Sequence, residues 1–268
     1  MKEKQKEERY NIRVLDRAIS ILSLLSDGRP RTLMEVSEGI DLSASTCFRM
    51  LSALASHNYI ARDEASGQYS LGVACLELAR SYQMSNHIRR VALPELEALR
   101  DETAETVHLA VLDRMEVLYL DKLPGLHAIG LMVSHVGGRV PSYCTGLGKA
   151  LLAYTDTERV RQHFERTPLT RFTDTTLVQV DQLLAELQEI RRRGYALDRG
   201  EHEPDVRCVA APIFDSQHKI AAAISIAGPS SRMEPLESNQ ERITRLLRAA
   251  QTISTQLGYG RTSHAENH

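Results

Sequence analysis

Residues 32–71 of the chain read TLMEVSEGIDLSASTCFRMLSALASHNYIARDEASGQYSL. Thr32 and Glu35 stand three positions apart, the spacing of a capping box, so a short helix is predicted to begin there. Residues 41–42 interrupt that helix, and Ser43 can cap a second one. The stretch therefore predicts two short helices separated by a tight turn.

The second of these helices has two chemically different sides. Four apolar residues at positions i, i+3, i+4 and i+7 share one side, namely Cys47, Met50, Leu51 and Leu54. The opposite side carries Ser45, Arg49, Ser52 and Ser56, flanked by Thr46 and Phe48. Short hydrogen-bonding side chains and one arginine are the chemistry needed to enter a DNA major groove.

A hairpin follows the two helices. Residues 59–62 and 68–71 are short β-like runs, and residues 63–67 form the turn between them. Helix, turn, helix and hairpin in this order indicate a winged helix-turn-helix. An ordinary helical hairpin whose polar side meets only water remains the alternative, because short helix pairs are common. The predicted DNA-contacting residues are Arg31, Ser43, Ser45, Thr46, Phe48, Arg49 and Arg62.

The charge of the chain does not by itself indicate nucleic acid. The formal net charge is −2, and residues 1–72 hold ten Lys or Arg against ten Asp or Glu. Any DNA affinity must therefore come from the positions of the positive charges and not from their number. Arginines 29, 31, 49 and 62 are expected near the groove-facing edge. A module of balanced charge binds better as two copies, so dimerisation is expected.

Length and composition favour a soluble protein of two modest domains. The 268 residues are 42% hydrophobic and 25% charged, and no apolar run approaches the roughly 20 residues that cross a bilayer. The four cysteines, Cys47, Cys75, Cys144 and Cys208, form no CxxC pair. This spacing favours a reducing compartment, so the cytoplasm is expected, with no membrane contact.

Helical and strand-like patterns divide the rest of the chain. A scaffold helix is predicted over residues 14–26, with an apolar stripe of Leu15, Ala18, Ile19, Leu22 and Leu25. A connecting helix is predicted over residues 72–84. Further helices are expected at 94–104, 145–154, 157–165, 177–193 and 239–257, and strands at 106–112, 117–120, 128–133, 139–143, 195–198, 208–214 and 220–227. Hairpins interspersed with long helices indicate an α+β domain on an antiparallel sheet.

Thr145-Gly146-Leu147-Gly148-Lys149 is the most informative stretch of this second domain. Two glycines at a helix start leave backbone N–H groups bare, and the helix dipole favours an anion there. The stretch matches neither a Walker loop nor GxGxxG. A tight helix-packing turn is the competing interpretation.

Residues of the second domain could also suggest a metal site or a cysteine nucleophile. Asp198, His202, Asp205 and Cys208 could suggest a metal site, but their spacing fits no familiar zinc pattern, and no metal or other cofactor is predicted. A nucleophilic Cys208 or Cys144 with a histidine base would make the chain an enzyme. Nothing in the sequence places a histidine beside either thiol, so no catalytic residue is predicted.

Several motifs together resemble those of the IclR family of bacterial transcription regulators, nearly from end to end. They are STCFRML at 45–51 with NYI at 58–60, TGLGKALLA at 145–153, RGY at 193–195 followed by Asp198, Glu201 and CVAAPIFD at 208–215, and AISIAGP at 223–229. The resemblance implies a winged helix-turn-helix at 10–71, a linker helix at 72–86, a GAF-like effector-binding domain at 87–260, and disordered tails at 1–9 and 261–268. It also implies a homodimer or homotetramer that binds a double-stranded DNA operator.

The resemblance further implies a small organic effector, often a carboxylate, that controls operator binding. Backbone N–H groups of Gly146 and Leu147 would hold it, Asp198, Cys208 and Ser225 would line its pocket, and Ile129, Met132 and Val140 would form an apolar wall. Three positions depart from the family pattern: Ala227 replaces a serine, Phe48 replaces a polar residue, and Asn58 replaces a glycine. We therefore expect a ligand-responsive regulator, a repressor rather than an activator, with a thiol enzyme and a dimerising scaffold as alternatives.

Overall fold

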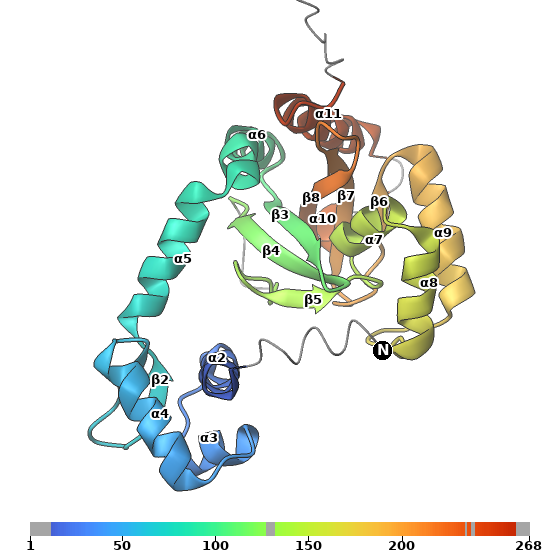
Figure 1. The fold of residues 1–268 in the computed structure, drawn as a ribbon. Coiled ribbons are helices and arrows are strands. Elements are labelled where there is room, and N and C mark those ends of the chain that lie inside the picture. The colour runs from blue at the N-terminus through green and yellow to red at the C-terminus, as the bar shows by residue number, and fades with distance from the viewer. Residues whose placement is uncertain (1–11, 127–131, 234, 237–238, 261–268) are drawn as a thin grey trace, which may run out of the picture. The chain divides into compact units, whose positions relative to one another are not determined.

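A computed structural model describes residues 12–126, 132–233, 235–236 and 239–260 (Figure 1). The chain divides into two compact units, Met1–Ser85 and Asn86–His268. The two predicted tails and Ile129 lie outside the described residues. None of the described helices is long and apolar enough to cross a membrane.

The first unit has the predicted order of helices and hairpin. Its elements are α2 (Arg13–Leu25), α3 (Leu33–Gly39), α4 (Ala44–Ser56), β1 (Ile60–Arg62), β2 (Tyr69–Leu71) and α5 (Val73–Ser85). Both hydrogen bonds of the capping box form between Thr32 and Glu35, and the Ser43 side chain caps α4. Arg31 exchanges two backbone hydrogen bonds with Tyr69, which forms an isolated antiparallel bridge beside β2. These features form a winged helix-turn-helix.

The core of this unit is small and leaves two helices with exposed apolar side chains. It consists of Ile21, Leu25, Val36, Cys47, Leu51, Ile60 and Tyr69. The apolar stripe predicted on α2 is only partly buried in this core, because Leu15 and Ile19 are 55% and 61% exposed. Helix α5 buries no residue, and Val73, Leu76, Leu78, Tyr82 and Met84 are all exposed. The described part of the chain therefore offers an uncovered apolar surface on each of these helices.

The second unit is built on one antiparallel sheet of six strands in the order β5-β4-β3-β8-β7-β6. The strands are β3 (Thr106–Asp113), β4 (Glu116–Leu123), β5 (Arg139–Pro141), β6 (Ala196–Asp198), β7 (Val206–Phe214) and β8 (Ile220–Pro229). Alternate residues of the central strands belong to two different cores, as a pleated sheet with both faces covered requires.

Helices cover both faces of this sheet (Figure 1). Helices α6 (His87–Thr103), α10 (Ser230–Met233) and α11 (Gln240–Gln256) lie on one face, and α7 (Gly146–Ala153), α8 (Thr157–Arg166) and α9 (Val180–Arg193) lie on the other. The α+β class and the antiparallel sheet are as predicted.

Two elements differ from the sequence-based expectation. Helix α6 begins seven residues before Pro94, because the Asn86 side chain accepts the Arg89 N–H as an N-cap and Ala92 and Leu96 bury the intervening turns. Pro94 is tolerated inside the helix, where this packing compensates for the missing backbone donor. Of the strand expected at 128–133, only Met132 and Val133 are described, and neither lies in a strand.

Candidate functional site

The exposed side of α4 carries the side chains expected to meet DNA. Ser45, Phe48 and Arg49 are exposed, whereas Cys47 and Leu51 face the core. Ser43 is occupied at the helix start, where its hydroxyl accepts the Thr46 N–H at 3.4 Å. Arg49 makes no ion pair with any described residue. The structure thus leaves an unpaired cation on the outer side of a helix that begins with three hydroxyl side chains.

The other two arginines predicted to contact DNA differ in how far the fold engages them. The Arg31 guanidinium forms a bidentate ion pair with Asp27, at 2.7 and 2.8 Å, and donates to the Leu24 carbonyl. This pairing lowers the pKa of the Asp27 carboxyl. Arg62 is exposed, and its guanidinium lies 5.6 Å from the centre of the Tyr69 ring. Arg31 therefore has a structural role, while Arg62 remains accessible on the wing.

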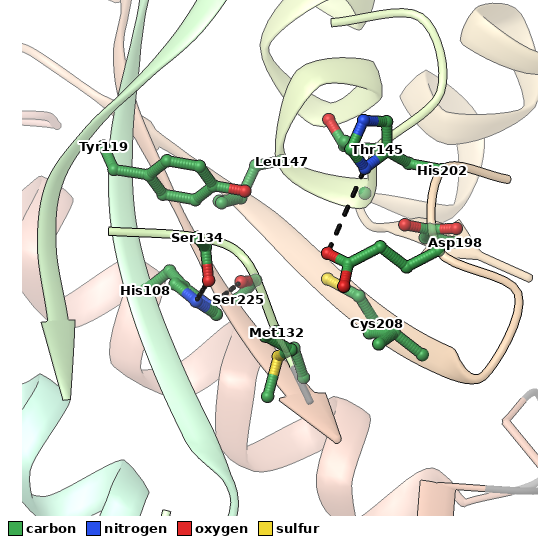
Figure 2. A pocket seen from close by; sticks show the side chains of 14 residues that line it. His108, Tyr119, Met132, Ser134, Thr145, Leu147, Asp198, His202, Cys208 and Ser225 are labelled. Carbon is green, nitrogen blue, oxygen red and sulfur yellow. Dashed lines mark hydrogen bonds and ion pairs between the residues drawn. The ribbon is translucent and has the colours of Figure 1, made fainter. Parts of the chain in front are cut away.

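Strand register gathers the polar residues of the second unit at one place on the sheet. His108 of β3 pairs with Ser225 of β8, and Cys208 of β7 pairs with both Asp198 of β6 and Ala227 of β8. These five residues face the same side, where the N-terminus of α7 packs. They surround a narrow cavity (Figure 2).

Six of the predicted effector-binding residues line this cavity: Met132, Gly146, Leu147, Asp198, Cys208 and Ser225. Val140 does not line it and instead packs against the core on the α7 side. Eight further lining residues were not among the predicted effector contacts: His108, Tyr119, Ser134, Thr145, His202, Glu203, Val206 and Ala227. Thr145 had a signal, because it directly precedes Gly146 as an N-cap; its side chain accepts the Gly148 N–H at 3.1 Å.

A buried histidine connects two walls of the cavity (Figure 2). His108 Nε2 lies 3.0 Å from Ser134 Oγ, and Ser225 Oγ lies 3.4 Å from His108 Nδ1. Burial, with a smaller contribution from the Lys122 charge, lowers the pKa of His108 to about 3. The imidazole is therefore neutral at physiological pH, with one nitrogen donating and the other accepting. Lys122 holds the same wall by donating to the Ser134 carbonyl at 2.5 Å.

The start of α7 already has an anionic neighbour of its own. Asp198 Oδ1 accepts the N–H groups of Gly200 at 3.0 Å and Glu201 at 2.9 Å. Burial raises the pKa of Asp198, while the Lys149 charge and nearby N–H groups, Gly146 among them, oppose that rise. Lys149 is itself buried and forms an ion pair with Glu201. Leu147 N–H has no acceptor among the described residues, so it is the free donor at this helix start.

The two thiols nearest the cavity are unsuited to nucleophilic chemistry. Burial raises the pKa of Cys208 and of Cys144, so the reactive thiolate is disfavoured at both positions. No hydrogen bond joins either thiol to a histidine in the described part of the chain. No cluster of three or more metal-ligating side chains occurs among the described residues.

The fold and the cavity together define a class of protein: a transcription regulator with a winged helix-turn-helix and a separate ligand-binding unit. Comparison with known proteins gives the family. The model of the IclR helix-turn-helix domain matches residues 14–64, and that of the bacterial transcriptional regulator IclR C-terminal domain matches residues 80–255. The chain belongs to the IclR family of bacterial transcription regulators, and it is a DNA-binding regulator, not an enzyme.

Relatives with established names agree with this placement. The chain is 34% identical to the HTH-type transcriptional regulator KdgR of Escherichia coli over 91% of its own length and 92% of that protein. It is 33% identical to the E. coli HTH-type transcriptional repressor AllR over 91% and 90%. An IclR homologue from Microbacterium hydrocarbonoxydans, solved in complex with 4-hydroxybenzoate, superimposes with a TM-score of 0.79 at 28% identity, covering 91% of this chain and 98% of that one.

Proposed function

We propose that the cavity beside α7 binds a small hydroxylated carboxylate, such as a hydroxy acid or sugar acid, and that this ligand controls operator binding. The free N–H of Leu147 at the helix start is the observation that carries the proposal, because it offers a donor and positive potential to a carboxylate. No lysine or arginine lines the cavity in the described part of the chain. Backbone N–H groups, hydroxyls and the two histidines of the lining, His108 and His202, are therefore the donors available to the anion.

Hydroxyl groups on the ligand would complete the binding. Asp198 Oδ1 accepts two backbone N–H groups, and the Gly146 N–H also interacts with this carboxylate, so a ligand hydroxyl would donate to a carboxylate that backbone donors already hold in place. Ser134, Thr145 and Ser225 add hydroxyls on the other walls. The 4-hydroxybenzoate bound by the Microbacterium homologue likewise carries one carboxylate and one hydroxyl, which supports this class of ligand.

Ligand entry requires movement of a wall. The cavity measures about 40 Å³, which is room for about three waters. Met132 and Ser134 belong to a segment outside the sheet, so we propose that this wall moves when the effector binds. A wall that changes position on binding also gives the ligand a way to alter the rest of the chain.

We further propose that the regulator acts as a homodimer, or a dimer of dimers, in the cytoplasm, where its operator is accessible. The exposed apolar side chains of α2 and α5 support pairing through the first unit. In each copy, Arg49, Ser45 and Phe48 would contact base edges, and Arg62, Ser43 and Thr46 would contact the backbone. The name of AllR supports repression as the direction of control.

The ligand hypothesis can be tested by a thermal-shift screen of hydroxy acids, sugar acids and simple carboxylates. A ligand at 100 times its dissociation constant should stabilise the chain by about 2.7 kcal/mol. Calorimetry with the best ligand would then compare wild type, Ser225→Ala and Leu147→Pro, which removes the proposed N–H donor. Unchanged affinity in both variants, with both still folded, would place the effector elsewhere.

A further inference from the structure

A second hollow opens on the surface of the effector-binding unit, well separated in its lining from the cavity beside α7. It measures about 340 Å³ and is lined by Met115, Arg159, Gln162, His163, Arg166 and Thr167. None of these residues lines the first cavity. A volume above about 300 Å³ is in the range of small-molecule sites. We refer to this hollow as the α8 groove.

One side of the α8 groove is a single helix face. Arg159, His163 and Arg166 follow at i, i+4 and i+7, whereas Val160 and Phe164 point into the core. The two arginines are separated by seven residues, or about 10.5 Å of helix rise. Flexible arginine side chains at that separation can converge on one ligand or contact two anionic groups of it.

The opposite side of the α8 groove is the turn between β3 and β4. Arg114 and Met115 both have left-handed backbone conformations, with φ of 53° and 66°. Such conformations are unfavourable for residues with a Cβ, and the burial of Met115 against the core compensates for them. Met115 thereby forms an apolar floor beneath the cationic side chains.

The arginines of the groove differ from their neighbours in having no partner. Arg161 pairs with Asp181, Arg192 with Glu189 and Arg193 with Glu186. Neither Arg159 nor Arg166 makes a side-chain hydrogen bond or ion pair with any described residue. The acids nearest the turn, Asp113 and Glu116, are both engaged by Arg139. No Asp or Glu is among the lining residues. The nearest carboxylate on α8, that of Glu158, accepts the Gln162 side-chain amide at 2.8 Å and forms no ion pair with either arginine of the groove in the described part of the chain.

Complementarity with the helix dipole does not explain this arrangement. Arg166 stands in the last turn, where the negative end of the α8 dipole favours a cation. Arg159 stands in the first turn, where the same dipole disfavours a cation. Asp156 and Glu158 place negative charge in that turn, but among the described residues neither carboxylate pairs with the Arg159 guanidinium; Asp156 Oδ1 accepts only the backbone N–H of Arg159, at 2.8 Å. An external anion would account for the free guanidinium at this end of the helix.

We propose that the α8 groove is a second ligand site, which binds a compact polyanion such as an organic phosphate or a polycarboxylate. Guanidinium groups match phosphate and carboxylate oxygens in bidentate geometry, and His163 and Thr167 add donors between and beside them. The site is independent of the effector cavity, so the regulator would receive two chemically different small-molecule signals.

Calorimetry at low ionic strength on the full-length chain tests whether the α8 groove binds a polyanion. Pyrophosphate represents the phosphate ligands and citrate the polycarboxylates, and each is titrated separately. The test variant is Arg159→Gln/Arg166→Gln. The matched control is Arg161→Gln/Arg192→Gln, which removes the same charge from α8 and α9 at positions outside the groove. We expect one site per chain for at least one probe, weakened at least about tenfold in the test variant and less than about twofold in the control.

Several results would overturn the proposal. Equal weakening in both double variants would mean an adventitious ion only, attracted by overall charge. The same conclusion follows if neither probe saturates at millimolar concentration. An oligoglutamate peptide that binds in the Arg159- and Arg166-dependent manner, while neither small probe does, would make the groove a protein-docking surface instead. Because both arginines are exposed and unpaired, the thermal midpoint of the test variant should equal that of wild type, which checks its fold.

Discussion

At the scale of single residues, Arg49 and Arg31 show how similar side chains in one module acquire different roles. Arg49 is exposed and unpaired on α4, whereas Arg31 is held by Asp27 and the Leu24 carbonyl. We expect Arg49→Ala to weaken operator binding by about 1–3 kcal/mol, because the proposed contact with a base edge would be lost. Gel-shift titration at constant salt measures this loss.

Arg192→Ala is the control for Arg49→Ala, since it removes an exposed arginine of the second unit. It should bind operator as wild type does, and both variants should keep the wild-type thermal midpoint. If Arg49→Ala also binds operator normally, α4 does not read the groove through this residue.

Asp198 should make stability depend on pH in a direction set by its burial. Its pKa in the folded chain is raised above the ordinary value of 3.8, so the folded state prefers the protonated form. The stabilisation is present below pH 3.8 and is lost as pH rises through the higher folded pKa. Asp198→Asn retains an oxygen for the Gly200 and Glu201 N–H groups but cannot ionise.

We therefore expect Asp198→Asn to flatten the dependence of the thermal midpoint on pH above pH 3.8, with higher relative stability at the upper end of the range. Glu201→Gln is the comparison variant, because it removes a neighbouring acid. It also leaves the buried Lys149 without its ion-pair partner, so it should lower the stability of the folded chain. If the thermal midpoint of Asp198→Asn changes with pH in the same way as that of the wild type, the pKa of Asp198 is not raised in the folded chain and the prediction is wrong.

At the scale of elements, the start of α7 is packed so closely that its two glycines are required for different reasons. A Cβ on Gly148 would lie 2.1 Å from the Ser142 carbonyl oxygen, which is backbone and cannot move aside. A Cβ on Gly146 would lie 2.8 Å from Cys208 Sγ, a side-chain atom that can be removed.

This difference gives a double-mutant test. Gly146→Ala should destabilise the wild-type chain by about 1–3 kcal/mol, but by less than about 1 kcal/mol in a Cys208→Ala background, where the sulfur is absent. Gly148→Ala should be severely destabilising in both backgrounds. Urea denaturation measures all of these changes. An equal penalty for Gly146→Ala in the two backgrounds would contradict the observed contact.

At the scale of the whole molecule, the proposal that operator binding needs two chains rests on the exposed apolar side chains of α2 and α5. Leu76 is 73% exposed on α5, so Leu76→Asp should leave the fold intact but prevent association through this helix. We expect a shift from dimer to monomer in sedimentation, and a loss of at least about tenfold in affinity for a palindromic operator.

Phe172→Asp is the matched control for Leu76→Asp. Phe172 is 45% exposed in the second unit, away from both α2 and α5 in the chain. This variant should stay associated and bind operator as wild type does. A Leu76→Asp protein that remains dimeric would move the interface away from α5.

The local sequence determined most of the elements of both units. Capping at Thr32 and Ser43, the apolar spacing of α4 and the runs of β7 and β8 depend on residues within a few positions of one another, so pattern alone reveals them. Failures came where packing overrides local preference. Pro94 lies inside α6, and Leu15 and Ile19 of α2 stay exposed although their spacing predicts burial.

The site itself was decided in large part by the tertiary structure. The TGLGK motif and the family resemblance pointed to Gly146 and Asp198. They did not reveal that the Asp198 carboxylate lies beside the Gly146 N–H and also accepts the N–H groups of Gly200 and Glu201. His108 and Ser225 are 117 positions apart and meet only because β3 pairs with β8 in one register. The local sequence determines whether each segment favours helix or strand. Contacts across a sheet depend instead on strand order and register, which are set only when all segments pack together.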